Sequence, residues 1–210
     1  DSPVTVLFDP LPARTGYDFL GWAVSDSATE PTFVSGGSAP LTMGTEDVTL
    51  YAVWSLNHYS ISYVLNDSTA FPANNTANPT GYTMLDDTIH LANPTRTGYT
   101  FDHWDPAGTI EQGATGDRTF TAYWTADTYT IHYVLNGGTN DTGNPETYTA
   151  ASDTINLAPA TRPGYSFLGW YVGSTPNSTI AAGSTGDKTF TAKWSAPIWY
   201  NITYTMNGGI

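Results

Sequence analysis

Alternating apolar and polar residues define several short strands along the chain. The clearest is 59–66, where apolar side chains occupy positions 59, 61, 63 and 65. A period of two places these side chains on one face of an extended segment, so we expect a strand with one buried face. Residues 129–138 have the same pattern and end in Gly137-Gly138, a pair typical of a hairpin turn.

Three more strands are expected after each of these opening strands. All are rich in Val, Ile, Thr and aromatic residues, which favour a pleated conformation. They are 82–91, 99–104 and 119–124 after the first, and 147–157, 165–171 and 189–194 after the second. Residues 4–8 form a further strand-like run, followed by turn-forming residues at 9–12. No segment has a 3.6-residue period, so little or no helix is expected.

One aromatic motif occurs three times. It reads Arg-Thr-Gly-Tyr-Asp-Phe-Leu-Gly-Trp at 14–22, Arg-Thr-Gly-Tyr-Thr-Phe-Asp-His-Trp at 96–104 and Arg-Pro-Gly-Tyr-Ser-Phe-Leu-Gly-Trp at 162–170. A closing strand follows each copy and ends in Trp54, Trp124 or Trp194, a spacing of 70 residues each time. A fixed period indicates a tandem array. We expect a divergent or shortened repeat at 1–54, full repeats at 59–124 and 129–194, and the opening strand of a further repeat at 198–210.

The residues shared by the copies are interpreted as structural. The motif glycines are expected at backbone positions with φ > 0 or without room for a Cβ atom. The repeated tryptophans are expected in the cores of the repeats, and the alternative is a sugar-stacking platform. Trp199 has no counterpart, and we expect it to be exposed or at an interface. The shared residues are Gly16, Gly98, Gly164, Trp22, Trp104, Trp170, Trp54, Trp124 and Trp194.

No set of residues predicts catalysis, a cofactor or a metal. The chain has no cysteine, which excludes disulfides and thiolate chemistry. The four histidines share no motif position, and the acidic pairs at 46–47 and 86–87 lack calcium-loop spacing. The chain is therefore predicted not to be an enzyme. The histidines are His58, His90, His103 and His132.

The charge balance limits the partners. A net charge of −13 with few basic residues argues against nucleic acid and anionic membrane surfaces. No run of 18 apolar residues is present, so no membrane insertion is expected in this segment. Polarity from Thr, Ser, Asn and Gly favours an extracellular, cell-surface location, and we interpret the chain as a mature fragment or a piece of a longer protein. Candidate N-glycosylation sites are Asn66, Asn74, Asn140 and Asn177.

The stretch from Asn93-Pro94-Thr95 through the second copy of the motif to Trp124 resembles the Listeria–Bacteroides repeat, also known as the B repeat of internalin B. Residues 129–138 are similar to the start of that repeat. The resemblance covers 59–124 and 129–194, a shortened copy at 4–54 and the start of another at 199–209. It implies a β-grasp-like fold and a place in tandem arrays of secreted or cell-surface bacterial proteins, where such repeats act as spacers.

We therefore expect an elongated, semi-rigid array whose joints, 55–58 and 125–128, are too short to swing freely. Its expected role is that of a spacer, stalk or filament-forming module of an adhesin-like protein, with neighbouring repeats or other copies of itself as partners. An end strand could complement the shortened first repeat of another copy. The alternative is a carbohydrate- or host-receptor-binding module with a glycan or protein ligand. The expected interface strand consists of Trp199, Tyr200, Ile202, Tyr204 and Met206.

Overall fold

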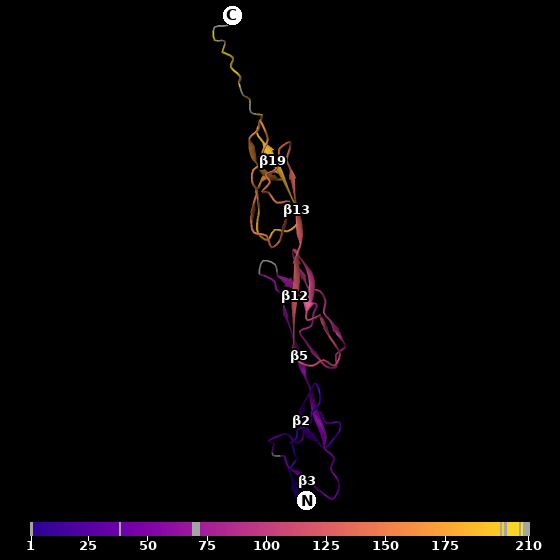
Figure 1. The fold of residues 1–210 in the computed structure, drawn as a ribbon. Coiled ribbons are helices and arrows are strands. Elements are labelled where there is room, and N and C mark those ends of the chain that lie inside the picture. The colour runs from indigo at the N-terminus through magenta and orange to yellow at the C-terminus, as the bar shows by residue number, and fades with distance from the viewer. Residues whose placement is uncertain are drawn as a thin grey trace. The chain divides into compact units, whose positions relative to one another are not determined.

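A computed structural model describes residues 2–37, 39–68, 72–197, 199, 201–205 and 207. None of these residues is helical, and their regular structure consists of short strands (Figure 1), which confirms the predicted mostly-β fold class. The chain divides into two compact units. The first consists of Asp1–Leu65, Thr76–Asn93 and His103–Ala122, and the second of Asn66–Asn75, Pro94–Asp102 and Tyr123–Ile210. The boundaries between the units fall inside the second repeat.

The third repeat is built on a five-stranded sheet with the order β14-β13-β19-β16-β17. Its opening strand, β13, pairs in parallel with its closing strand, β19, and the other ladders of this sheet are antiparallel. The parallel pairing of first and last strands fits the expected β-grasp-like arrangement. A separate antiparallel ladder joins β15 and β18. The strands are β13 (Thr128–Val134), β14 (Thr147–Thr149), β15 (Ile155–Asn156), β16 (Phe167–Val172), β17 (Thr175–Pro176), β18 (Thr179–Ile180) and β19 (Lys188–Trp194).

One face of this sheet forms the core of the third repeat. Ile131 of β13 and Phe190 of β19 are buried, and Trp170 is 1% exposed. The Tyr133 ring lies 5.3 Å from that of Trp170 and 6.5 Å from that of Phe190, centroid to centroid. Full burial of a large apolar side chain contributes about 1.5–3 kcal/mol. A few such aromatic residues can therefore supply the core of a domain of this size.

The second repeat has the same plan. Its sheet order is β6-β9-β10-β12-β5-β7, and its opening strand, β5, again pairs in parallel with its closing strand, β12. A short ladder joins β8 and β11. Strands β10 and β12 each run through both compact units. The strands are β5 (His58–Val64), β6 (Ala73–Asn74), β7 (Gly81–Thr83), β8 (Ile89–His90), β9 (Thr95–Arg96), β10 (Tyr99–Asp105), β11 (Thr109–Ile110) and β12 (Arg118–Ala126).

The prediction of one continuous second strand at 82–91 and at 147–157 is wrong, because a turn divides each segment into two short strands. In the second repeat the Thr83 N–H donates to the Asp86 carboxylate (2.7 Å), and the Asp86 N–H donates to the Thr83 carbonyl (3.2 Å). In the third repeat Ser152 takes the same role towards Thr149. Short polar side chains that bond the nearby backbone favour turns over ladders.

The first repeat is reduced. It has two two-stranded ladders, β1-β3 and β2-β4, whose strands are β1 (Ser2–Val4), β2 (Tyr17–Ala23), β3 (Leu41–Met43) and β4 (Tyr51–Leu56). The strand expected at 4–8 is wrong. Only residues 2–4 meet a partner, β3, and 5–8 belong to no strand. Its aromatic contacts still match those of the third repeat, with Phe19 edge-on to Trp54 at 5.4 Å, as Phe167 is to Trp194.

The described residues of the opening strand expected at 198–210 do not form a strand. Residues 199 and 201–205 lie outside any strand, and Trp199, Ile202 and Tyr204 are 87%, 76% and 86% exposed. The related strand β13 is held between β14 and β19, whereas no described strand pairs with residues 199 and 201–205. The exposure of Trp199 confirms the prediction for that residue. Tyr200 and Met206 lie outside the described residues.

Candidate functional site

The Arg-x-Gly-Tyr segment of the motif forms a tight turn in each repeat. The Tyr17 N–H donates to the Arg14 carbonyl (3.0 Å), and the Tyr165 N–H donates to the Arg162 carbonyl (3.2 Å). The glycine at the third position of the turn has a φ of 74° to 77° in the three copies, where a residue with a Cβ atom is strained. The prediction of a positive φ is therefore confirmed.

The arginine of each turn stacks on the tyrosine of the same turn. The distance from the guanidinium carbon to the ring centroid is 3.8 Å for Arg14 and 3.7 Å for Arg96 and Arg162. Arg96 also donates to the Asn66 carbonyl oxygen (2.9 Å). The stacked arginine thus fixes the shape of the turn in all three repeats.

The first two repeats are joined by a single residue. Strand β4 ends at Leu56 and β5 begins at His58, so Asn57 alone forms the joint. The Asn57 backbone N–H donates to the carbonyl oxygen of Gly16 (2.9 Å), and its side-chain amide donates to the Asp18 carboxylate (3.2 Å). A Cβ atom on Gly16 would lie only 2.1 Å from the Met84 sulfur. The turn of the first repeat is therefore packed against the second repeat.

The joint between the second and third repeats repeats this geometry. Asp127 is the only residue between β12 and β13. Its N–H donates to the Gly98 carbonyl (3.0 Å), and its carboxylate accepts from the Thr100 hydroxyl (2.7 Å). A Cβ atom on Gly98 would lie 2.7 Å from the Ala150 Cβ and 3.0 Å from the Thr185 methyl carbon. The expected four-residue joints are thus wrong, because the strands extend to within one residue of each other.

Aspartates that follow a glycine lie close to both joints. The Asp117 carboxylate accepts from the Ser60 backbone N–H (2.7 Å), which lowers the pKa of that carboxyl, and Asp187 accepts from Thr130 in the same way (2.8 Å). Burial raises the pKa of the Tyr129 phenol, and the nearby Asp127 and Asp187 raise it further.

In the first joint a polar groove of about 470 Å³ is lined by Asp18, Asn57, His58 and Asp117, among others.

The third copy of the turn differs, because no described residue packs against its glycine. Gly164 has the same positive φ, but it is exposed and no described atom outside its immediate neighbours would lie within 4 Å of its Cβ. Pro197, at the position of Asn57 and Asp127, has no N–H to donate. Ser195 is bonded instead, as its N–H donates to the Ser166 carbonyl (2.9 Å) and its hydroxyl oxygen accepts from the Ser166 N–H (3.0 Å).

A buried asparagine links the core tryptophan to the rest of the third repeat. Asn144 is 8% exposed and makes two bonds to Ala158: its amide donates to the carbonyl (3.0 Å), and its oxygen accepts from the N–H (2.7 Å). The same carbonyl accepts from the Trp170 indole (2.8 Å). Asn78 bonds Ala92 in the same way in the second repeat. Sequence reasoning missed both asparagines, although the Asn-Pro-x-x-Tyr pattern shared by the two full repeats was the available signal.

The repeated tryptophans are packed into their own repeats. Trp104 and Trp170 are 6% and 1% exposed, and the closing tryptophans are half-buried. Phe101 meets Trp124 edge-on at 5.6 Å, as Phe167 meets Trp194 at 5.4 Å. Their burial favours the core interpretation over a sugar-stacking platform.

The remaining candidate residues are dispersed. The histidines are all exposed, and no group of three or more His, Asp or Glu that could hold a metal occurs in the part of the chain that the structure describes. Asn66, Asn74 and Asn177 are exposed, whereas Asn140 is partly buried and its side-chain oxygen accepts from Asn144 (2.8 Å). N-glycosylation of these asparagines stays a prediction.

The fold and the joints define a tandem array of small all-β domains. The family model of the Listeria-Bacteroides repeat domain matches residues 2–53, 59–123 and 129–193, and the chain belongs to this family. The predicted resemblance is therefore confirmed over three copies.

Two relatives come from Evansella cellulosilytica. A protein named "Putative Gly-rich membrane protein" is 26% identical over all of this chain and 24% of its own length. A "Putative membrane protein" is 26% identical over 76% of this chain and 23% of its own length. The chain thus spans about a quarter of the length of these relatives. No helix among the described residues is long and apolar enough to span a membrane.

A solved structure is also similar. It contains Streptococcal High Identity Repeats in Tandem (SHIRT) domains 3-4 from a cell surface protein. The identity is 15%, the match covers 65% of this chain and 96% of that one, and the TM-score is 0.23, too low to establish a shared fold.

Proposed function

We propose that this chain is a non-enzymatic spacer segment of an extracellular cell-surface protein. The observation that carries this proposal is the single-residue joint. Asn57 and Asp127 each connect a closing strand to the next opening strand, and each donates its backbone N–H to the glycine of the preceding turn. In this proposal the partners of each repeat are its neighbours in the array.

The joints are built to resist bending. Bending a joint breaks its two hydrogen bonds, each with a net value of about 0.5–1.5 kcal/mol, and also separates the packed turn. A cost of about 2 kcal/mol limits the bent form to a few per cent of the population. The two compact units agree with this estimate, since the contacts of the first joint lie in the first unit and those of the second joint in the second unit. Length would then grow with the number of repeats.

The family, the relatives and the charge support a surface location. The chain contains three copies of the family's repeat, and two relatives have names that describe membrane proteins. A net charge of −13 opposes binding to nucleic acid or to anionic lipid. These observations favour a role at the cell surface over one in the handling of nucleic acid.

Removing one repeat tests the spacer role. In a variant lacking residues 58–127, Asn57 is followed directly by Thr128 and Tyr129, so one full period is lost and a one-residue joint is kept. Small-angle scattering should show that the maximum dimension falls by about the length of one repeat. A maximum dimension that changes only as expected for a compact particle of lower mass would contradict the proposal.

A finer form of the proposal is assembly between chains through an added strand. Strand β4 pairs only with β2 in the described structure, whereas β12 and β19 each have a parallel and an antiparallel partner. Ile202 and Tyr204 correspond to Ile131 and Tyr133 of the paired strand β13, and both are exposed. These residues could add to the open edge of β4 in another copy.

Deleting residues 198–210 tests this form of assembly. Sedimentation should then show that polymers of the intact chain disappear. A chain that stays monomeric with the segment present, or that polymerises without it, would exclude assembly through this strand.

The second candidate function is glycan binding, and the 87% exposure of Trp199 is the observation that favours it. A glycan array probed with the chain and with Trp199→Ala separates the two functions. Binding that Trp199→Ala abolishes would support a binding module, and an array without signal would leave the spacer role as the better account.

A further inference from the structure

A groove of about 430 Å³ lies beside the motif turn of the third repeat. Its walls include Arg162, Tyr165, Phe167 and Trp194, and each of these residues is partly exposed. A volume of this size lies in the range of small-molecule sites, which combine aromatic walls with a few polar groups that orient a ligand. Arg162 supplies the charge of the groove, and none of the residues that line it is acidic.

The Arg162 guanidinium is held in place, yet its N–H groups have no acceptor among the described residues. Its Cζ atom lies 3.7 Å from the centroid of the Tyr165 ring. A Cβ atom on Gly137 would lie 3.4 Å from the same Cζ atom, so the main chain of Gly137 also lies against the guanidinium. A fixed guanidinium with free donors suits a carboxylate, which accepts two parallel hydrogen bonds from it.

The second repeat uses the corresponding arginine differently. Arg96 stacks on Tyr99 in the same way, but it donates to the Asn66 carbonyl oxygen (2.9 Å). Asp67 stands where the third repeat has Gly137, and strand β6 pairs with the main chain at Arg96. The arginine of the second repeat thus has an acceptor within the protein, whereas the arginine of the third repeat is available to a ligand.

The corresponding groove of the first repeat is less suited to an anion. It is lined by Arg14 but also by Asp18. Residues 1–54 contain seven acidic residues and one basic residue, whereas residues 129–194 contain four and three. Like charges repel at close range, so an anionic ligand is favoured in the third repeat.

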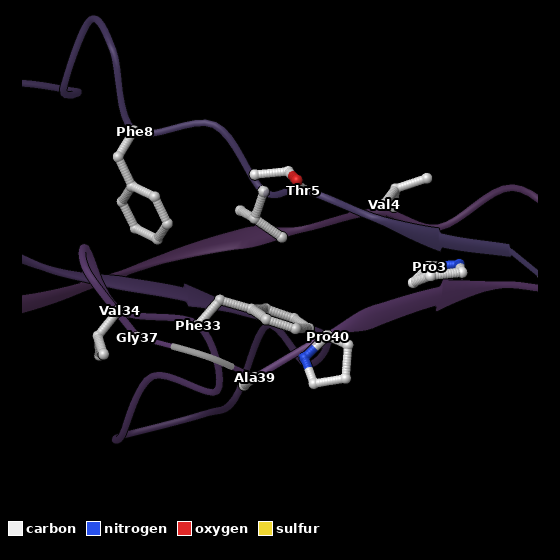
Figure 2. A pocket seen from close by; sticks show the side chains of 10 residues that line it. Pro3, Val4, Thr5, Phe8, Phe33, Val34, Gly37, Ala39 and Pro40 are labelled. Atoms are coloured by element: carbon white, nitrogen blue, oxygen red, sulfur yellow. The ribbon is translucent and has the colours of Figure 1, made fainter.

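A further cavity of the first repeat has no charged group at all. It has a volume of about 360 Å³ and is lined by apolar side chains such as Phe8 and Phe33 (Figure 2). None of the residues that line this cavity is charged. The groove of Arg162 therefore differs from it in having a fixed cation within aromatic walls.

We propose that the groove of Arg162 binds a uronic acid residue of an acidic saccharide. The carboxylate of the sugar accepts two hydrogen bonds from the guanidinium, and the apolar face of the sugar ring lies against the exposed parts of Phe167 and Trp194. Trp194 keeps its structural role, because its indole N–H donates to the Leu135 carbonyl (3.0 Å). This site adds ligand binding to the spacer role, which does not depend on it.

A saccharide fits this groove better than an acidic peptide does, because the main chain beside it offers a peptide few partners. The Thr161 N–H donates to the Thr139 carbonyl (2.9 Å), and the Thr161 carbonyl accepts from Thr139 (2.8 Å). The Arg162 carbonyl accepts from the Tyr165 N–H (3.2 Å), and Pro163 has no N–H. Recognition in the groove therefore depends on side chains.

Titration of a galacturonic acid trisaccharide into the intact ¹⁵N-labelled chain tests the site. The chain has four arginines and hence four Nε–H signals, and Arg162→Gln identifies the signal of Arg162. We expect this signal to move and to saturate, while that of Arg96 stays in place. The same trisaccharide with methyl-esterified carboxyl groups is the control and should move neither signal. Absence of a saturable change, or an equal change with the ester, would overturn the proposal.

Replacing each arginine separates the groove from the overall charge. Arg162→Gln loses hydrogen bonds between charged groups, so the trisaccharide should bind at least about tenfold more weakly. Arg96→Gln removes the same charge at the corresponding position of the second repeat and should bind as the unaltered chain does. Equal weakening by both variants, or equal affinity of all three proteins, would contradict the site. The ester keeps the test decisive if Arg162→Gln does not fold.

A blocked peptide of three glutamates tests the class of ligand. It carries as many carboxylates as the trisaccharide but has no sugar ring. We expect it to bind much more weakly, with a correspondingly smaller change of the Arg162 signal at equal concentration. Binding as tight as that of the trisaccharide would contradict recognition of a saccharide.

Discussion

Gly98 and Gly164 occupy the same place in two copies of one motif, but their surroundings differ. Both have a φ close to 76° and both follow an arginine that stacks on the next tyrosine. Gly98 is buried against Ala150 and Thr185 of the following repeat, whereas Gly164 is exposed. The turn therefore forms within a single repeat, and the contact with the next repeat is a separate property. The positive φ explains why all three copies of the turn have a glycine. The close approach of the next repeat is a second reason only at Gly16 and Gly98.

The first and third repeats show a second difference of this kind. Trp170 donates its indole N–H to the Ala158 carbonyl, which also accepts from Asn144, whereas the Trp22 indole nitrogen has no hydrogen-bond partner among the described residues. Even so, Phe19 packs on Trp22 and Trp54 much as Phe167 packs on Trp170 and Trp194. The aromatic contacts thus persist without the polar network. Among the described residues, the shortened repeat lacks this network and also lacks a parallel partner for β4.

The largest expected difference between the glycines comes from Gly98→Ala and Gly164→Ala. Both replacements put a Cβ atom on a residue with a positive φ, which lowers the free energy of unfolding by about 1–2 kcal/mol. Gly98→Ala should lose a further 1–3 kcal/mol, roughly, because its new methyl group meets Ala150. Gly16→Ala should fall between them, since the flexible Met84 side chain can move away. Urea unfolding followed by NMR signals of each repeat measures the losses, and equal losses at 98 and 164 would refute the distinction.

The polar network predicts a somewhat smaller effect. Asn144→Ala leaves the Ala158 N–H and carbonyl without their partner, so the third repeat should lose about 1–3 kcal/mol. Asn140→Ala removes a single bond to Asn144 and should lose less than about 1.5 kcal/mol. The same urea experiment applies. If both variants were equally stable, the asparagine would not be the link between the tryptophan and the rest of the repeat.

The smallest effect concerns pH. The Ser60 N–H lowers the pKa of Asp117 in the folded chain, so this carboxylate adds stability above about pH 4 that is lost as the pH falls through its folded pKa. Asp117→Asn should therefore flatten the dependence of stability on pH in the acidic range. Asp26→Asn, in an exposed turn, controls for the loss of one charge. Identical pH profiles for the variants would show that the Ser60 bond does not contribute.

Much of the fold followed from local pattern. The alternation at 129–135 and the aromatic motif identified β13, β16 and β19, because one buried face determines each of these strands. The single strand expected at 82–91 was wrong because Asp86 bonds the backbone of Thr83. The described residues of 198–210 form no strand, because pairing depends on partners that local sequence does not reveal. The apolar pattern was read as ending at the closing tryptophans, which hid the true length of β12.

The site was less predictable. The motif glycines were correctly expected at special backbone positions, but packing between repeats also involves Met84, which differs from its counterpart in the third repeat, Ala150. The Trp22 indole nitrogen is buried without a hydrogen-bond partner among the described residues, and this difference appears only when the repeats are compared in three dimensions. Asn78 and Asn144 occupy the same position of the Asn-Pro-x-x-Tyr pattern in the two full repeats, and this signal was overlooked.

Distances between spin labels across each joint test the central claim most directly. The chain has no cysteine, so labels can be placed at matched positions: Leu20 and Val64 across the first joint, and Asp102 and Val134 across the second. Because one bonded residue forms each joint, electron–electron resonance should show a single narrow distance distribution for both pairs. Inserting Gly-Gly-Ser-Gly after Asn57 or Asp127 should broaden the distribution at that joint alone. Broad distributions in the unaltered chain would contradict joints that hold the repeats in place.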